Sequence, residues 1–129
     1  MIKFTLPWPP SVNSYWRRNG GRYFISGQGT RFRMETQQIC LKYRGHFESK
    51  DRLSVIINAF PPDRRRRDLD NIQKGLFDSL QHSGVYVDDN QIDQILITRQ
   101  TELLGMVEVT ISKMGSLNLK SLNQNVDPV

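Results

Sequence analysis

The chain reads Leu53-Ser-Val-Ile-Ile-Asn-Ala-Phe60, then Pro61-Pro62 and, after a run of charges, Leu69-Asp-Asn-Ile-Gln-Lys-Gly-Leu-Phe-Asp-Ser-Leu80. The first segment is rich in Val and Ile and is closed by two prolines, which is typical of a strand. In the second segment apolar residues recur at helical spacing, and Gly84 supplies a stop. This part of the chain therefore predicts a strand followed by a helix.

The flanking sequence adds further strands and one more helix. Segments 2–7 and 106–111 alternate apolar and polar residues, as half-buried strands do. A helix is predicted from a cap at Ser26 or Thr30 to about Tyr43. We also expect a loop at 11–21 and strands at 22–25, at 85–87 and around 92–97. This order predicts an α+β fold: a single small domain with a mixed β-sheet packed with two main helices.

Length and composition narrow the class of protein. The chain has 129 residues, of which 37% are hydrophobic, and this suits one globular domain. It has no apolar run of about 20 residues, no signal-peptide pattern and a single cysteine, Cys40. We therefore expect no membrane partner and a reducing, cytoplasmic setting. Residues 1–114 are expected to form the domain, and residues 115–129 a polar, mobile tail.

Positive charge is concentrated at one place. The formal net charge is +5, yet without Arg64, Arg65, Arg66 and Arg67 the chain would hold 14 basic and 13 acidic residues. A second basic cluster includes Arg17 and Arg18 (17–33). Concentrated arginine favours a polyanion such as nucleic acid. The alternative for the arginine run is a solvated loop or a localisation tag.

Two carboxylates, Asp68 and Asp70, follow the arginines directly. On a helix, residues two apart point about 200° from each other, whereas in an extended segment they face the same side. If Asp68 lies outside a helix that begins around Asp70, both carboxylates can converge on one Mg²⁺. The alternative is that Asp68 caps the helix, with Asp70 favoured in its first turn.

Lys74 and a second acidic pair extend the pattern. Lys74 is four residues after Asp70 and could contact a phosphate, or could merely form a surface pair with that aspartate. Adjacent residues at a strand end point in opposite directions, so at most one of Asp88 and Asp89 is expected to join a metal site. Asp88-Asp89-Asn90 is also good turn chemistry. Asp78 is a weaker candidate and is expected to face solvent.

Together these motifs resemble the RusA family of Holliday junction resolvases of bacteria and their phages. The resemblance runs from about Phe4 to Met114. It rests on Leu6-Pro-Trp-Pro-Pro-Ser11, on Pro62-Asp-Arg-Arg-Arg-Arg-Asp-Leu-Asp-Asn-Ile-Gln-Lys74, and on Val87-Asp-Asp-Asn-Gln91. The loop at 45–52 does not align clearly, and the tail is longer than the family needs.

The resemblance implies a RusA-like fold and a symmetric homodimer that uses Mg²⁺, or Mn²⁺, and no small-molecule cofactor. It implies that Asp68, Asp70 and Asp89 bind the metal, that Lys74 is a further catalytic residue, and that Arg67 and its neighbours contact the junction. The implied activity is an endodeoxyribonuclease that resolves four-way junctions by paired nicks in opposed strands, within a bacterial or phage-infected cell.

Two other functions remain open from the residues alone. One is a broader nuclease that cuts flaps, D-loops and other branched DNA. The other is a nucleic-acid-binding protein without catalysis. The acidic cluster speaks against the second, because it would weaken polyanion binding unless a metal neutralised it.

Overall fold

A four-stranded sheet forms the centre of the computed structural model, which describes residues 1–115. Its strands lie in the order β1 (Ile2–Pro7), β6 (Met106–Lys113), β4 (Leu53–Phe60) and β5 (Ile92–Arg99). β4 pairs antiparallel with β6 and parallel with β5. The sheet is therefore mixed, and the α+β prediction is confirmed.

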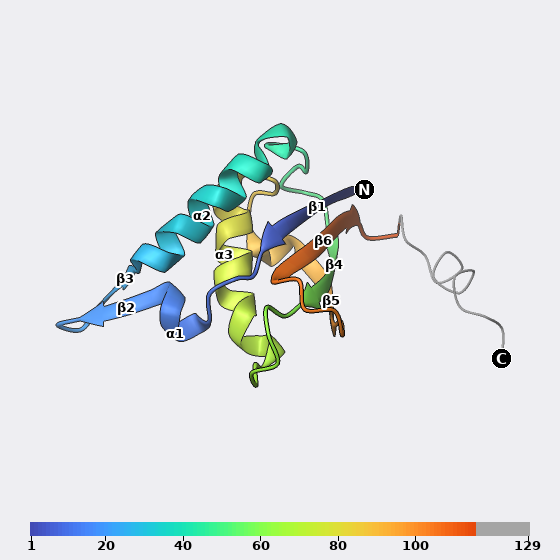
Figure 1. Ribbon diagram of the computed structural model, residues 1–129. Coiled ribbons are helices and arrows are strands. Elements are labelled where there is room, and N and C mark those ends of the chain that lie inside the picture. The colour runs from blue at the N-terminus through green and yellow to red at the C-terminus, as the bar shows by residue number, and fades with distance from the viewer. Residues whose placement is uncertain (116–129) are drawn as a thin grey trace.

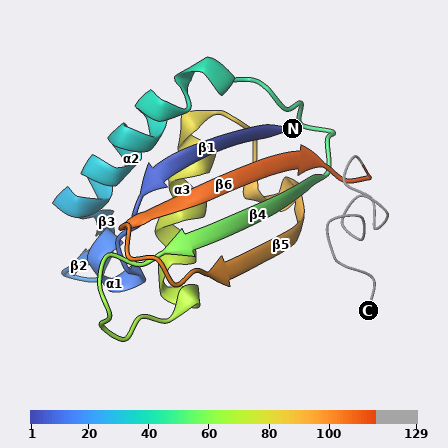
Figure 2. The same ribbon diagram turned by 45° about the vertical axis from the view of Figure 1, so that its right-hand side comes forward.

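Two main helices, α2 (Gly27–Ile39) and α3 (Gln73–Ser83), cover one face of this sheet (Figures 1 and 2). α3 is the crossover that a parallel β4–β5 pair requires. Of the two predicted caps for α2, Ser26 is the one in place, since its hydroxyl accepts a hydrogen bond from the Gly29 amide. α2 ends at Ile39, and a separate 3-10 turn, η1 (Leu41–Tyr43), follows it, so the predicted end near Tyr43 was too late.

The core lies between the sheet and the helices. β1, β4 and β6 turn alternate side chains inward, and these are buried against the apolar faces of the helices. The main buried side chains of these layers are Phe4, Leu6, Phe32, Val55, Ile57, Leu76, Leu80, Val107 and Val109.

The prediction of a loop at 11–21 was wrong. Ser11 caps a single turn, α1 (Val12–Tyr15), and β2 (Trp16–Asn19) then pairs with β3 (Arg22–Ile25) as a hairpin. Gly20 and Gly21 form its two-residue turn with φ of 58° and 83°, values that favour glycine. The alternation of apolar and polar residues is weak in this hairpin, because most of its side chains are exposed on both faces.

The predicted strand at 85–87 does not form either. Val85 and Tyr86 are buried, but their backbone is irregular. The Val87 amide donates to the Gln91 side chain, so a side-chain acceptor replaces a strand partner there. The predicted tail lies, after Gly115, outside the described residues. None of the helices within residues 1–115 has the length and apolar character that crossing a bilayer requires.

Two short 3-10 turns carry the acidic motifs. η2 (Leu69–Ile72) leads from the arginine run into α3, and η3 (Asp89–Gln91) leads into β5. Tyr15 packs directly over α3 at Gly75, where an added Cβ would lie 2.8 Å from the tyrosine ring. This close approach brings α1 and the hairpin against the helix that holds Lys74.

Candidate active site

One surface hollow collects most of the predicted catalytic residues. Its volume is about 340 Å³, and Asp70 from η2, Lys74 from α3 and Asp89 from η3 line it. Gln73, Phe77 and Asp78 complete the lining. We call this the carboxylate hollow. It brings together three of the four predicted catalytic side chains from two segments of the chain.

Asp68 lies outside the carboxylate hollow. Its backbone is extended (φ −90°, ψ 137°), as the sequence allowed, and its side chain makes no capping hydrogen bond. The exposed carboxylate lines a neighbouring hollow together with Arg66 and Arg67. The Asp68 side chain therefore does not cap the helix. It also does not line the carboxylate hollow that holds Asp70.

The two residues of the second acidic pair do different work. The Asp88 side chain accepts a hydrogen bond from the Asn90 amide and, with Gln91, forms a capping box for η3. Asp89 instead accepts a hydrogen bond from the buried Tyr86 hydroxyl at 2.6 Å. Asp88 therefore has the turn-forming role that was the alternative for this acidic pair, whereas Asp89 lines the carboxylate hollow.

Burial sets the protonation behaviour of Asp89. Desolvation raises the pKa of its carboxyl, and the negative charges of Asp78 and Asp88 raise it further. The Tyr86 hydrogen bond and the positive charge of Lys74 act in the opposite direction. Because a raised pKa reflects an unfavourable environment for the anion, a cation in the hollow would stabilise the charged form.

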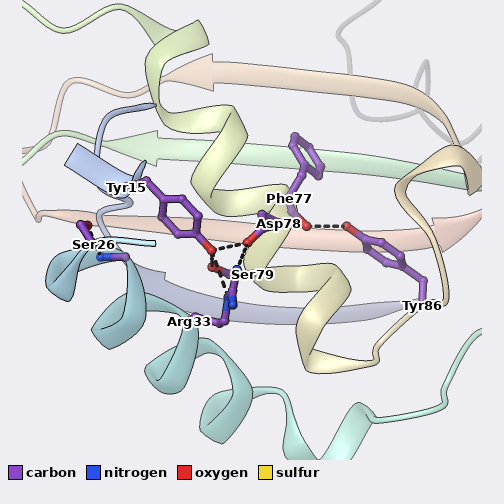
Figure 3. Close-up of polar contacts among 8 residues, drawn as sticks. Tyr15, Ser26, Arg33, Phe77, Asp78, Ser79 and Tyr86 are labelled. Carbon is purple, nitrogen blue, oxygen red and sulfur yellow. Dashed lines mark hydrogen bonds and ion pairs between the residues drawn. The ribbon is translucent and has the colours of Figure 1, made fainter. Parts of the chain in front are cut away.

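Asp78 does not face solvent as expected. Its carboxylate is half-buried, and it accepts hydrogen bonds from the Tyr15 hydroxyl and, at 2.6 Å, from Nη2 of Arg33 (Figure 3). Nε of Arg33 also donates to the Tyr15 oxygen at 3.2 Å. Asp78 is four residues after Lys74, a spacing that could have placed it on the same side of the helix. No local signal connects it to Tyr15 or Arg33.

The arginine run divides into free and paired members. Arg67 forms an ion pair with Asp63, which lowers the pKa of that carboxyl to about 2, and Nη2 of Arg99 donates to the Arg67 carbonyl. Arg65 lies 3.9 Å from the same aspartate. Arg64 and Arg66 are exposed and form no ion pair with any residue in 1–115. These two are the arginines of the run that are available to an outside phosphate.

The second predicted basic cluster adjoins Lys74. Arg17 and Arg18 of β2 line a hollow of about 450 Å³ with Tyr23, and Lys74 belongs to this hollow as well as to the carboxylate hollow. The Arg18 guanidinium lies 5.7 Å from the centre of the Tyr23 ring, within the range of a cation–π contact. The hairpin thereby extends a basic surface to the edge of the carboxylate hollow.

This chain is similar to known proteins over most of its length. Residues 7–112 match the family described as "Endodeoxyribonuclease RusA". The chain belongs to the RusA family. It is 48% identical over 103 residues to a protein of Enterobacteria phage HK97 named crossover junction endodeoxyribonuclease rusA, covering 80% of this chain and 86% of the relative.

Bacterial RusA proteins are similar as well. Those of Shigella sonnei (strain Ss046) and Escherichia coli (strain K12) are 40% and 39% identical over 113 residues. Each match covers 87% of this chain and 94% of the relative. Both carry the name crossover junction endodeoxyribonuclease RusA, so the RusA resemblance inferred from the motifs is confirmed.

The donor set of this RusA chain suits a hard cation. Within residues 1–115, no three His, Cys, Asp or Glu side chains are grouped so that they could hold a metal ion by themselves. Mg²⁺, however, is commonly bound by one or two carboxylates together with water and substrate phosphates. Asp70 and Asp89 supply carboxylates to one hollow, and Lys74 lies in it with them.

Proposed function

We propose that this chain is a metal-dependent, structure-specific endodeoxyribonuclease that resolves four-way DNA junctions by paired nicks in opposed strands. One observation carries the proposal: Asp70, Lys74 and Asp89 share a hollow in a RusA-family chain. Basic side chains lie close to it in sequence at Arg66 and in space at Arg17. Its relatives named crossover junction endodeoxyribonuclease support the substrate class and a cytoplasmic setting in a bacterium or an infected cell.

Asp70 and Asp89 would hold a Mg²⁺ or Mn²⁺ ion, joined by Asp68 if DNA binding turns that exposed side chain inward. When bound, the ion would activate water and stabilise the leaving oxygen. The chain's own residues prepare this chemistry. Tyr86 orients Asp89 through its hydrogen bond, and Arg33 neutralises Asp78 so that a third carboxylate does not repel the phosphate.

Lys74 and the arginines would place the phosphodiester. Lys74 lies in the carboxylate hollow, where its ammonium can offset charge that builds on the phosphate in the transition state. Arg64 and Arg66 are exposed and form no ion pair within residues 1–115, and Arg17 and Arg18 line the adjoining hollow. Contacts of this kind fix the position of the DNA backbone and do not read bases.

A symmetric homodimer would match the two-fold symmetry of a four-way junction. The edge strand β5 supports this part of the proposal, because Ile95 and Leu96 on its two faces are 45% and 53% exposed. Leu103 and Leu104 in the loop after β5 are exposed as well. An apolar edge strand is prone to pair with another chain, and a second copy would cover it.

Cleavage assays on matched substrates test the proposal. A four-way junction, a flap and a plain duplex are each incubated with and without Mg²⁺, and the nicks are mapped to the nucleotide. We expect symmetric paired nicks in the junction only, and only with the metal. Equal cleavage of the flap would indicate a broader branched-DNA nuclease, and binding without cleavage would contradict an enzymatic role.

Asp70→Asn separates catalysis from folding. The variant should lose cleavage by a factor of at least about 100 while it binds the junction as tightly as the unaltered chain or more tightly, since one negative charge is removed. Binding is measured by fluorescence anisotropy with Ca²⁺ in place of Mg²⁺. Loss of binding together with cleavage would show instead that Asp70 has a structural role.

A further inference from the structure

A larger hollow, of about 620 Å³, is lined by Asp68 and by Asn71, which directly follows Asp70 of the carboxylate hollow. We call it the Trp8 pocket. Trp8 and Phe32 supply aromatic rings to it, and Asn71 supplies an amide. Arg31 and Arg66 supply positive charge, and Glu35 and Asp68 supply negative charge. Its volume is within the range of sites that hold small organic groups. Neither the proposed cleavage chemistry nor the predicted phosphate contacts use Trp8 or Phe32.

The walls of the Trp8 pocket are held in place by the fold. The Trp8 amide donates to the Gly105 carbonyl at 3.0 Å, and the Gly105 amide donates to the Pro61 carbonyl at 3.2 Å. These bonds tie the Trp8 segment to the start of the loop that carries the arginine run. Phe32 is buried in α2. A pocket with fixed walls loses little conformational entropy when it is filled.

The composition of the pocket selects the chemistry of its occupant. The Trp8 side chain is half-buried and packs against the core, which leaves part of it open to the hollow. Arg31 and Arg66 are exposed and form no ion pair with any residue in 1–115. An aromatic ring beside unpaired guanidinium groups suits a flat, conjugated group attached to an anion. A nucleobase with its adjoining phosphate has this character.

We propose that the Trp8 pocket receives an unpaired nucleobase from the DNA strand that is cut, with its phosphate on Arg31 and Arg66. Only a base that has left the duplex stack can present its face to an aromatic ring. A branch point is the place where bases are most easily unstacked. This inference rests on the proposed function, because Asn71 in the wall of the pocket directly follows Asp70 in the carboxylate hollow, where that strand would be cut.

The test uses four-way junctions with 2-aminopurine at single positions around the branch point. The probe's emission is measured with saturating protein and Ca²⁺, and affinity is measured by anisotropy. At one or more positions we expect the probe to be quenched by the unaltered chain and by Trp8→Phe, and to be bright with Trp8→Ala. Trp8→Ala should bind the junction about 5- to 150-fold more weakly, as loss of one base–aromatic stack predicts.

The controls separate stacking from folding. Trp8→Leu keeps apolar bulk against the core without an aromatic face, so it should bind as weakly as Trp8→Ala while its thermal unfolding stays close to that of the unaltered chain. A duplex of the same sequence should show no difference between Trp8→Phe and Trp8→Leu. An equal loss of affinity for the duplex would overturn the inference.

The remaining outcomes are also decisive. Identical probe emission with the unaltered chain and with Trp8→Leu at every position would overturn the pocket assignment and leave the proposed function intact. If a Trp8 variant sediments differently from the unaltered chain but binds DNA equally well, the pocket holds a protein partner, and the inference is overturned. Failure of the unaltered chain to bind any branched DNA would overturn the proposed function itself, and the inference with it.

Discussion

At the scale of single residues, Asp89 depends on a partner that the motif does not contain. The Tyr86 hydroxyl is buried and donates to the Asp89 carboxylate at 2.6 Å. Burial and the neighbouring carboxylate raise the pKa of this hydroxyl, so it stays protonated and remains a donor. Tyr86 is therefore a positioning residue, which fixes the direction in which Asp89 presents its oxygens.

Tyr86→Phe should weaken metal binding far more than folding. Outer partners of metal ligands commonly contribute 10–100-fold to affinity, so we expect the Mg²⁺ concentration for half-maximal cleavage to rise about tenfold. The free energy of unfolding should fall by only about 1 kcal/mol. Cleavage against Mg²⁺ concentration measures the effect. Tyr43→Phe removes a more exposed hydroxyl, on η1, and serves as the control. An unchanged Mg²⁺ dependence would contradict the positioning role.

Asp63 contacts two arginines of the run, Arg67 closely and Arg65 at 3.9 Å. It pairs with Arg67, and the pair keeps that guanidinium from an outside phosphate. Asp63→Asn should release Arg67 and tighten junction binding. The slope of log affinity against log salt concentration should become more negative by about 0.9, the value for one additional phosphate contact. Asp93→Asn frees Arg52 near the start of β5 and provides a matched control. An equally steep slope for the two variants would show that freeing any arginine has this effect.

At the scale of elements, Asp78 joins the two main helices. Arg33 lies on α2 and Asp78 on α3, and Tyr15 from α1 binds both (Figure 3). Three elements far apart in sequence therefore meet at one carboxylate on the wall of the carboxylate hollow. A change in this network is expected to alter both the packing of the helices and the charge in the hollow.

Arg33→Ala should leave Asp78 as a half-buried charge without its cationic partner. We expect the free energy of unfolding to fall by about 1–3 kcal/mol. Asp78→Asn in the same chain should recover part of that loss, because no unpaired charge remains. Urea unfolding of the single and double variants measures the coupling. Arg31→Ala, an exposed position on the same helix, should have little effect. Strictly additive losses would rule out the coupling.

At the scale of the whole molecule, the edge strand β5 exposes apolar side chains at one side of the sheet. β5 has a single strand neighbour, β4, and two of its apolar side chains, Ile95 and Leu96, are exposed. A helix covers neither Leu96 nor the leucines that follow β5. The proposed paired nicks need two active sites that act on one junction, so a homodimer formed through this edge would link assembly to activity.

Leu96→Glu should separate the subunits. A charge on the edge strand opposes pairing with a second copy, so sedimentation should report a monomer. Cleavage should then give single, unpaired nicks at a lower rate. Leu41→Glu changes a leucine on η1 that is at least as exposed, and it should leave assembly unaltered. A Leu96→Glu chain that sediments as a dimer would exclude β5 as the interface.

The strands and helices with strong periodicity were predictable. β1, β4 and β6 alternate or are rich in β-branched residues, and α3 has an apolar face with Gly84 at its end. Of the hairpin, β3 was predicted and β2 was not, because the side chains of both strands are mostly exposed and show no burial pattern. Segment 85–87 was misassigned because its apolar residues are buried in an irregular backbone.

Three features can be recognised from the order of the amino acids without a structure: the acidic motif, the arginine run and the RusA relationship. Each depends on residues that are close along the chain. Which side chains meet depends instead on the folding of the chain in three dimensions. This folding put Asp89 beside Asp70 and Lys74, put Asp68 in a different hollow, and bound Asp78 to Tyr15 and Arg33. Such contacts join segments tens of residues apart, and they are set by how α2, α3 and the sheet pack rather than by any local preference.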